Sequence, residues 1–172
     1  DRRNGRQQYV YLANFDWYNY LYDDSRPTWD HNINIKGGTK ALSYMVSGRY
    51  YQQKGVNRIE PDMFKSYNFR VKLQAEIKPW LTIASNTKFF QSNYKYYGYE
   101  DEYNNFRKPT LHALASFVPV NPDGTAVSHT SMTQSSTHYL MDGYSAMMQK
   151  GKSFGNKKTQ EITTTFEATF KL

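Results

Sequence analysis

The residues best suited to chemistry in this chain are its histidines and serines, and their spacing assigns them no reaction. The four histidines, His31, His112, His129 and His138, form no HxxxH or HExxH pair of the kind that binds zinc on a helix. The chain has no cysteine, which excludes disulfides, cysteine zinc ligands and thiol catalysis. Neither a glycine-rich phosphate loop nor a nucleophile elbow is present. We therefore expect no enzyme, no metal site and no cofactor.

The charged residues suggest a wall that faces water. Lys and Arg total 22 against 15 for Asp and Glu, a formal net charge of +7. Basic residues interleaved with aromatic ones can bind nucleic acid. Here the cations are dispersed and share polar stripes with Asn or Glu, so we expect no nucleic-acid partner. The four clearest members of these stripes are Arg49, Arg70, Lys72 and Glu76.

A period-two alternation positions those side chains. From Tyr67 to Ile77 every odd position is apolar or aromatic and every even position is polar. Successive side chains on a strand point to opposite faces, so the pattern predicts a strand with one apolar face. Eleven residues at about 3.3 Å each, tilted by about 40°, cover about 28 Å, which is the thickness of the hydrocarbon core of a bilayer. The odd residues are therefore expected to face lipid.

Shorter alternations around this segment predict an all-β fold. We expect two strand pairs within 31–90, with tight turns at Gly37–Lys40 and Lys78–Trp80, and a further strand at 161–172. The links 55–66 and 91–160 are much longer. Short and long connections alternate in the same way in outer-membrane barrels. Upstream, the sequence is irregular, and Asp16 is expected to cap a short helix that ends at Leu21.

Segment 91–160 holds the candidate contacts to a ligand, because it shows no strand pattern and is long for a mere connection. Its aromatic rings and polar groups suit stacking and hydrogen bonding: Tyr96, Tyr97, Tyr99, Asn104 and Arg107. The tyrosines that follow the preceding strand have a second interpretation, as rings at a boundary between membrane and water. We place three further aromatic residues at such a boundary: Tyr67, Trp80 and Phe89. The acidic run 100–102 lacks the spacing of a calcium loop and leaves calcium binding open.

Several short segments, in consistent order, resemble one family. They read FDWY at 15–18, HNINIKGGT at 31–39, YMVSGRYYQQKG at 44–55, YNFR at 67–70, PWL at 79–81 and VPVNPDGT at 118–125. Together they resemble the SusC/RagA-type TonB-dependent transporters of the outer membrane of Gram-negative bacteria. The resemblance covers residues 15–125 and is weaker beyond them.

That resemblance implies a fold, a function and a set of partners. The fold is a 22-stranded barrel around a plug, and residues 1–172 are an early part of the barrel, with the plug and TonB box expected upstream. In this interpretation 91–160 is an extracellular loop, and Arg49, Arg70, Lys72 and Glu76 face the lumen. The family imports glycan or peptide fragments, uses energy delivered by TonB, and works with a SusD-type surface lipoprotein as a lid. An alternative is a soluble all-β glycan-binding module with exposed Tyr and Trp as sugar platforms.

Overall fold

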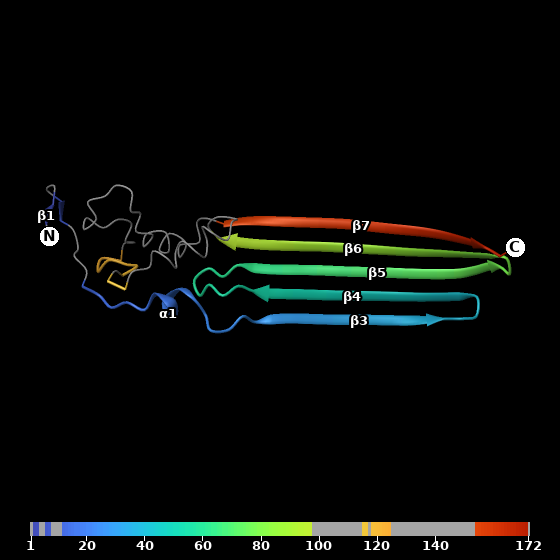
Figure 1. The fold of residues 1–172 in the computed structure, drawn as a ribbon, viewed down its shortest axis with the longest axis horizontal. Helices are drawn as coiled ribbons and strands as arrows, with labels where there is room; N and C mark the ends of the chain where they lie inside the picture. The colour runs from blue at the N-terminus through green and yellow to red at the C-terminus, as the bar shows by residue number, and fades with distance from the viewer. Residues whose placement is uncertain are drawn as a thin grey trace. The chain divides into compact units, whose positions relative to one another are not determined.

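Five long strands in one sheet make up most of the residues that the structure describes (Figure 1). The computed structural model describes residues 2–3, 6–7, 12–97, 115–116, 118–124 and 154–171. The sheet strands are β3 (Thr28–Gly38), β4 (Leu42–Lys54), β5 (Met63–Lys78), β6 (Leu81–Tyr97) and β7 (Phe154–Phe170). Two short strands, β1 (Arg2–Arg3) and β2 (Arg6–Gln7), pair with each other, and the helix α1 covers Trp17–Leu21. The expected all-β class is confirmed.

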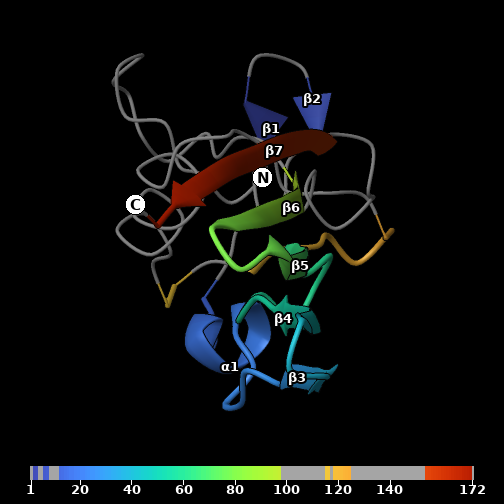
Figure 2. The same ribbon diagram turned by 90° about the vertical axis from the view of Figure 1, so that its right-hand side faces the viewer.

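The five strands are antiparallel neighbours in chain order, β3-β4-β5-β6-β7. Viewed along the strands, they form a single layer (Figure 2). The β3–β4 turn is closed by a hydrogen bond from the Thr39 N–H to the Leu42 carbonyl, 2.6 Å long, and the Thr39 hydroxyl accepts from the Leu42 N–H at 3.2 Å. The β5–β6 turn consists of Pro79 and Trp80. Both tight turns predicted from the sequence are confirmed.

The strands are longer than the side-chain alternation predicted. β3 begins at Thr28, three residues before the expected start at His31. β6 continues to Tyr97, and β7 already begins at Phe154. The expected loop boundaries of 91–160 are therefore wrong, and the connection between these strands is 98–153. The alternation ends earlier than the ladder because backbone hydrogen bonds hold a strand together after its two faces have both become polar.

The chain divides into two compact units. The sheet unit comprises Arg26–Gly55, Met63–Tyr94 and Asn156–Leu172. The described parts of Asp1–Ser25, Val56–Asp62 and Lys95–Gly155 form the second, the connecting unit. In the described part of the chain, no helix is long and apolar enough to cross a membrane.

An aromatic cluster around α1 organises the connecting unit. Trp17 is 5% exposed, and its ring lies edge-on to those of Phe15 and Tyr20, with centroids 5.1 and 5.9 Å away. Asp16 caps the helix as predicted, accepting from the Asn19 backbone N–H at 3.0 Å. Hydrogen bonds from the backbone and then the side chain of Asn19 hold the pKa of Asp16 below its ordinary value.

Two further segments belong to the connecting unit. Val56 and Arg58 pair with the chain that follows α1, and Arg58 forms an ion pair with Asp23 at 3.0 Å. The Asn-Pro-Asp-Gly sequence at 121–124 predicts a turn, and a hydrogen bond from the Gly124 N–H to the Asn121 carbonyl, 2.9 Å long, confirms it. The sequence also predicts a short helix from Thr110 to Phe117. This segment lies mostly outside the described residues, and its two described positions, 115–116, form a turn.

Candidate functional site

One face of the sheet unit is apolar along most of its length. The β3–β4 and β4–β5 registers place Ile35, Val46 and Val71 opposite one another on this face. Within the described sheet unit, every exposed large hydrophobic side chain of a strand belongs to it: Trp29, Ile33, Ile35, Leu42, Tyr44, Tyr67, Phe69, Leu73, Ile77, Ile83, Ile162, Phe166 and Phe170. We call it the apolar face. Ile162 and Phe166 are 72% and 77% exposed, so the structure leaves this surface uncovered.

Side-chain contacts extend the two faces across β6 and β7. Arg70 donates from Nε to Asn86 Oδ1 at 2.9 Å, which places even-numbered β6 residues on the polar face. The hydroxyls of Thr87 and Thr164 lie 3.3 Å apart, and Gln160 donates to Gln91 at 2.8 Å. These two pairs fit one antiparallel register, because Gln91 lies four residues after Thr87 on β6 and Gln160 lies four residues before Thr164 on β7. Odd-numbered β6 residues and even-numbered β7 residues therefore share the apolar face.

Aromatic rings lie near both ends of the apolar face. Toward the long connections, His31, Tyr50 and Tyr67 form a row across three strands, with ring centroids 6.3 and 5.2 Å apart. Toward the tight turns, Trp80 stacks on Phe170 with centroids 6.2 Å apart and an interplanar angle of 17°. We call the surface between these rings the apolar band. Beyond the row of His31, Tyr50 and Tyr67 the same face is mixed, because polar side chains such as Gln52 and Lys65 lie there beside Trp29 and Met63.

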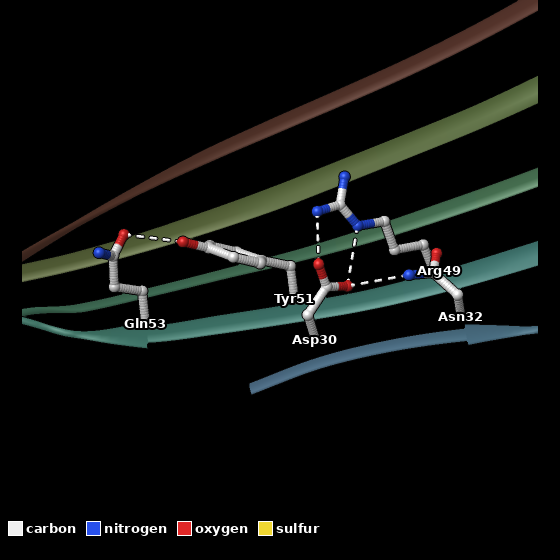
Figure 3. Close-up of polar contacts among 5 residues, drawn as sticks. All are labelled: Asp30, Asn32, Arg49, Tyr51 and Gln53. Atoms are coloured by element: carbon white, nitrogen blue, oxygen red, sulfur yellow. Dashed lines mark hydrogen bonds and ion pairs between the residues drawn. The ribbon is translucent and has the colours of Figure 1, made fainter. Parts of the chain in front are cut away.

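The opposite face carries paired charges. Arg49 donates two hydrogen bonds to Asp30, from Nε to Oδ1 at 2.9 Å and from Nη2 to Oδ2 at 2.6 Å (Figure 3). We call this bidentate pair the Asp30–Arg49 fork. Asn32 donates a third hydrogen bond to Oδ1, 3.3 Å long, and the guanidinium lies 5.6 Å from the centre of the Tyr51 ring. Asp30 lies opposite Tyr51 and Arg49 lies opposite Asn32, so Asp30 and Arg49 are diagonal neighbours on one face and the sheet register sets this geometry. The Asp30–Arg49 fork holds the Arg49 guanidinium in a fixed orientation on the polar face.

A line of polar groups continues from this fork along β4. The Tyr51 hydroxyl lies 3.1 Å from the amide of Gln53 (Figure 3). With the Gln53 amide oriented to satisfy both of its atoms, its nitrogen donates to Tyr51 and its oxygen accepts from Arg26 Nε at 2.7 Å. Donors and acceptors on the polar face of β4 are therefore fixed in direction, an arrangement suited to binding amides or hydroxyls.

The polar face is hollowed in two places. One depression, of about 470 Å³, is lined by side chains that include Asn32, Arg49, Asn68, Arg70, Lys88 and Glu161. A second, of about 500 Å³, is lined by Lys36, Ser43, Lys72, Gln74 and Glu167 among others. Both offer hydrogen-bond donors and acceptors of mixed charge. In the described residues no three of His, Asp and Glu come together in a way that would hold a metal ion.

The structure brings the expected wall residues together. Arg70, Lys72 and Glu76 alternate along β5, and Arg49 lies opposite Asn68 on the same polar face. Of the three expected boundary aromatics, Tyr67 and Trp80 belong to the aromatic rings at the two ends of the apolar band, and Phe89 lies on the apolar face of β6. Asp30 was not singled out in the sequence because the strand was expected to begin one residue later.

The expected ligand contacts are only partly described. Tyr96 and Tyr97 are strand residues at the end of β6, which corrects their expected place in a loop. The Tyr96 ring packs over Gly155, and Lys95 Nζ lies 4.8 Å from the centre of the Tyr97 ring and 5.3 Å from that of Phe154. Tyr99, Asn104, Arg107 and the acidic run 100–102 lie outside the described residues.

Comparison with known proteins adds no identification. Neither a protein-family profile nor a curated protein matches the chain.

Proposed function

We propose that the chain contributes five strands to the wall of a TonB-dependent outer-membrane transporter of the SusC/RagA type. Its apolar face contacts lipid and its polar face borders the lumen of a barrel with 22 strands. The protein imports glycan or peptide fragments through that lumen. The proposal combines the sequence resemblance with the two-faced sheet.

The uncovered apolar band is the observation that carries this proposal. Water-exposed apolar patches of more than a few hundred Å² are rare on soluble proteins and mark surfaces that another apolar phase covers. The band lies between aromatic rings, and Trp and Tyr rings prefer the boundary between lipid and water. Its extent along β5, Tyr67 to Ile77, corresponds to about 28 Å for a strand tilted by about 40°. That height equals the thickness of a bilayer core.

The polar face supports the same orientation. A shift of one residue in register would carry Arg70, Lys72 and Glu76 into the lipid-facing position. Charges at the bilayer midplane cost about 2–4 kcal/mol for each Arg or Lys. The alternation therefore strongly favours one orientation, in which the Asp30–Arg49 fork and both depressions face water in the lumen, where plug or cargo passes.

The strand lengths and edges favour a barrel over a small soluble domain. β5, β6 and β7 have 16, 17 and 17 residues, whereas strands of globular proteins usually have 3–10. Among the described strands, β3 and β7 pair on one side only. Open edges of this length invite aggregation, and closure with further strands removes them.

The remaining parts of the proposal follow from the resemblance. The connection 98–153 is placed outside the cell, where it contacts cargo and a SusD-type lipoprotein lid. TonB acts on the plug, and the outer membrane of a Gram-negative bacterium is the location. No cofactor or catalytic group takes part. The rival, a soluble glycan-binding module, would use exposed rings such as Trp29 and Trp80 as sugar platforms.

Purification of the full-length protein tests the proposal. Affinity-tagged protein should be recovered from the outer-membrane fraction in detergent, together with a surface lipoprotein. Replacing Tyr97, Tyr99 and Arg107 together by Ala should weaken binding of cargo or lid while leaving barrel abundance unchanged. Recovery of a folded protein from the soluble fraction without detergent would instead favour the glycan-binding module. Normal uptake and lid association in the triple variant would remove the assigned role of the connection.

A further inference from the structure

The carboxylates of the described strands lie on one face of the sheet unit, whereas basic side chains lie on both. On the apolar face the charged side chains of the described strands are four lysines. Lys54 in β4, Lys65 in β5 and Lys158 in β7 belong to the sheet unit, and Lys95 in β6 belongs to the connecting unit. The acidic side chains of the same strands, Asp30, Glu76, Glu161 and Glu167, all lie on the polar face. A face that met only water would gain nothing from excluding carboxylates.

The three lysines of the sheet unit lie at one end of the apolar face, the end next to the long connections. The positions are counted along the strands toward the long connections, and one step is two residues on the same face. Lys65 lies one step beyond Tyr67, Lys54 lies two steps beyond Tyr50, and Lys158 lies two steps beyond Ile162. Lys65 lies opposite Gln52 and Lys54 opposite Met63, so these two lysines are diagonal neighbours across β4 and β5. We call Lys54, Lys65 and Lys158 the lysine rim. At the tight-turn end, the last residues of the same face are uncharged, as Leu42, Ile77 and Phe170 show.

The height of the rim matches the headgroup layer. One same-face step is two residues, about 6.7 Å along a strand, so the rim begins about 5–10 Å beyond the band when the strands tilt by about 40°. The headgroup region adds about 5–8 Å to each side of the hydrocarbon core. The ammonium groups therefore reach the depth at which lipid phosphates lie.

We infer that the lysine rim binds the phosphate groups of anionic lipids in the leaflet next to the long connections. The inference rests on the proposed function, because it needs the apolar band to lie in a bilayer. Long Lys side chains place their stems on apolar surface and their ammonium groups in the headgroup layer. Amides that surround the rim, such as Gln91 and Gln160, add donors for phosphate oxygens. At the tight-turn end the strand residues of the apolar face carry no charge, so we expect this recognition in one leaflet only.

Photolabelling of the full-length protein in phosphatidylcholine vesicles tests the inference. Two probes are compared, a phosphatidic acid and a phosphatidylcholine with the same photoactivatable acyl chain, and labelled residues are mapped by mass spectrometry. Phosphatidic acid should reach half-maximal labelling next to the rim at a lower concentration than phosphatidylcholine. In the variant Lys65→Gln/Lys158→Gln that concentration should rise about 10- to 30-fold, since each lysine near anionic lipid contributes about one factor of five.

A matched control separates the rim from charge in general. Lys72→Gln/Lys157→Gln removes lysines from the same two strands on the other face, and we expect it to leave labelling unchanged. Equal labelling by both probes, or an equal loss in the control, overturns the inference. The phosphatidylcholine probe reports insertion separately. Labelling of the apolar band without phosphate preference overturns the rim alone, and absence of band labelling overturns the proposed function and the rim together.

Discussion

An arginine placed on either face of β5 should have very different consequences. Leu73 lies on the apolar face opposite Tyr44, two same-face steps from Ile77 and three from Tyr67. This position is close to the middle of the apolar band. Its neighbour Gln74 lies opposite Ser43 on the polar face. Leu73→Arg therefore puts a charge near the bilayer midplane, and Gln74→Arg puts the same charge in water.

The size of the difference follows from the depth. Arg at the midplane of a barrel costs about 2–4 kcal/mol, which corresponds to roughly a 30- to 1,000-fold change in the folding equilibrium. Gln74→Arg adds a cation between Lys72 and Glu76 on a solvated surface, so its effect should stay within about 0.5 kcal/mol. Urea titration of the full-length protein in lipid vesicles, with the heat-modifiable band on gels as the readout, measures both values. Leu73→Met serves as a control for shape without charge.

Equal destabilisation by the two arginines would refute the assigned orientation. A larger loss from Gln74→Arg than from Leu73→Arg would reverse it, placing the even residues of β5 in lipid. Loss in Leu73→Met as large as in Leu73→Arg would show that packing, and not charge, limits this position.

Three further outcomes follow from the same geometry. A Cβ atom added at Gly37 would lie 2.5 Å from the Tyr44 hydroxyl oxygen. Gly37→Ala should therefore destabilise the fold by about 1–2 kcal/mol. In the double variant with Tyr44→Ala, most of that loss should be relieved. Arg49 and Asp30 remain 48% and 37% exposed, so a double-mutant cycle should give only a weak coupling, whereas a strong coupling would show that water is excluded from the pair. A single cysteine at Lys78 should react with an impermeant thiol reagent only after the outer membrane is permeabilised, whereas reaction in intact cells would place the tight turns outside.

Side-chain alternation predicted the sheet where one face is apolar. Tyr67–Ile77 alternates without a break, and β5 contains it with four further residues before it and one after it. The alternation gave no sign of the ends of β6 and β7, because residues such as Gln91 and Lys158 are polar on the face that is apolar elsewhere. Periodicity of hydrophobicity detects a strand only while its faces differ, and these strands continue beyond that region.

The candidate site was predicted in part for a similar reason. Alternation alone places Arg70, Lys72 and Glu76 on one face, since they belong to one strand. The pairing of Arg49 with Asp30 depends on the register between β3 and β4, over a separation of 19 residues. Neither the spacing nor the composition of the sequence specifies that register. The lysine rim likewise joins three strands and becomes visible only once their faces are matched.

The central claim, that the apolar face of the sheet contacts lipid, is tested most directly by spin-label accessibility along β5. Single cysteines are introduced at 67–77 in the full-length protein; residues 1–172 contain no cysteine, and any cysteine elsewhere is first replaced by serine. In lipid vesicles, oxygen reports exposure to hydrocarbon and a water-soluble nickel complex reports exposure to water. We predict a period of two, with odd positions accessible to oxygen and even positions accessible to nickel. Nickel accessibility at odd and even positions alike would contradict the claim.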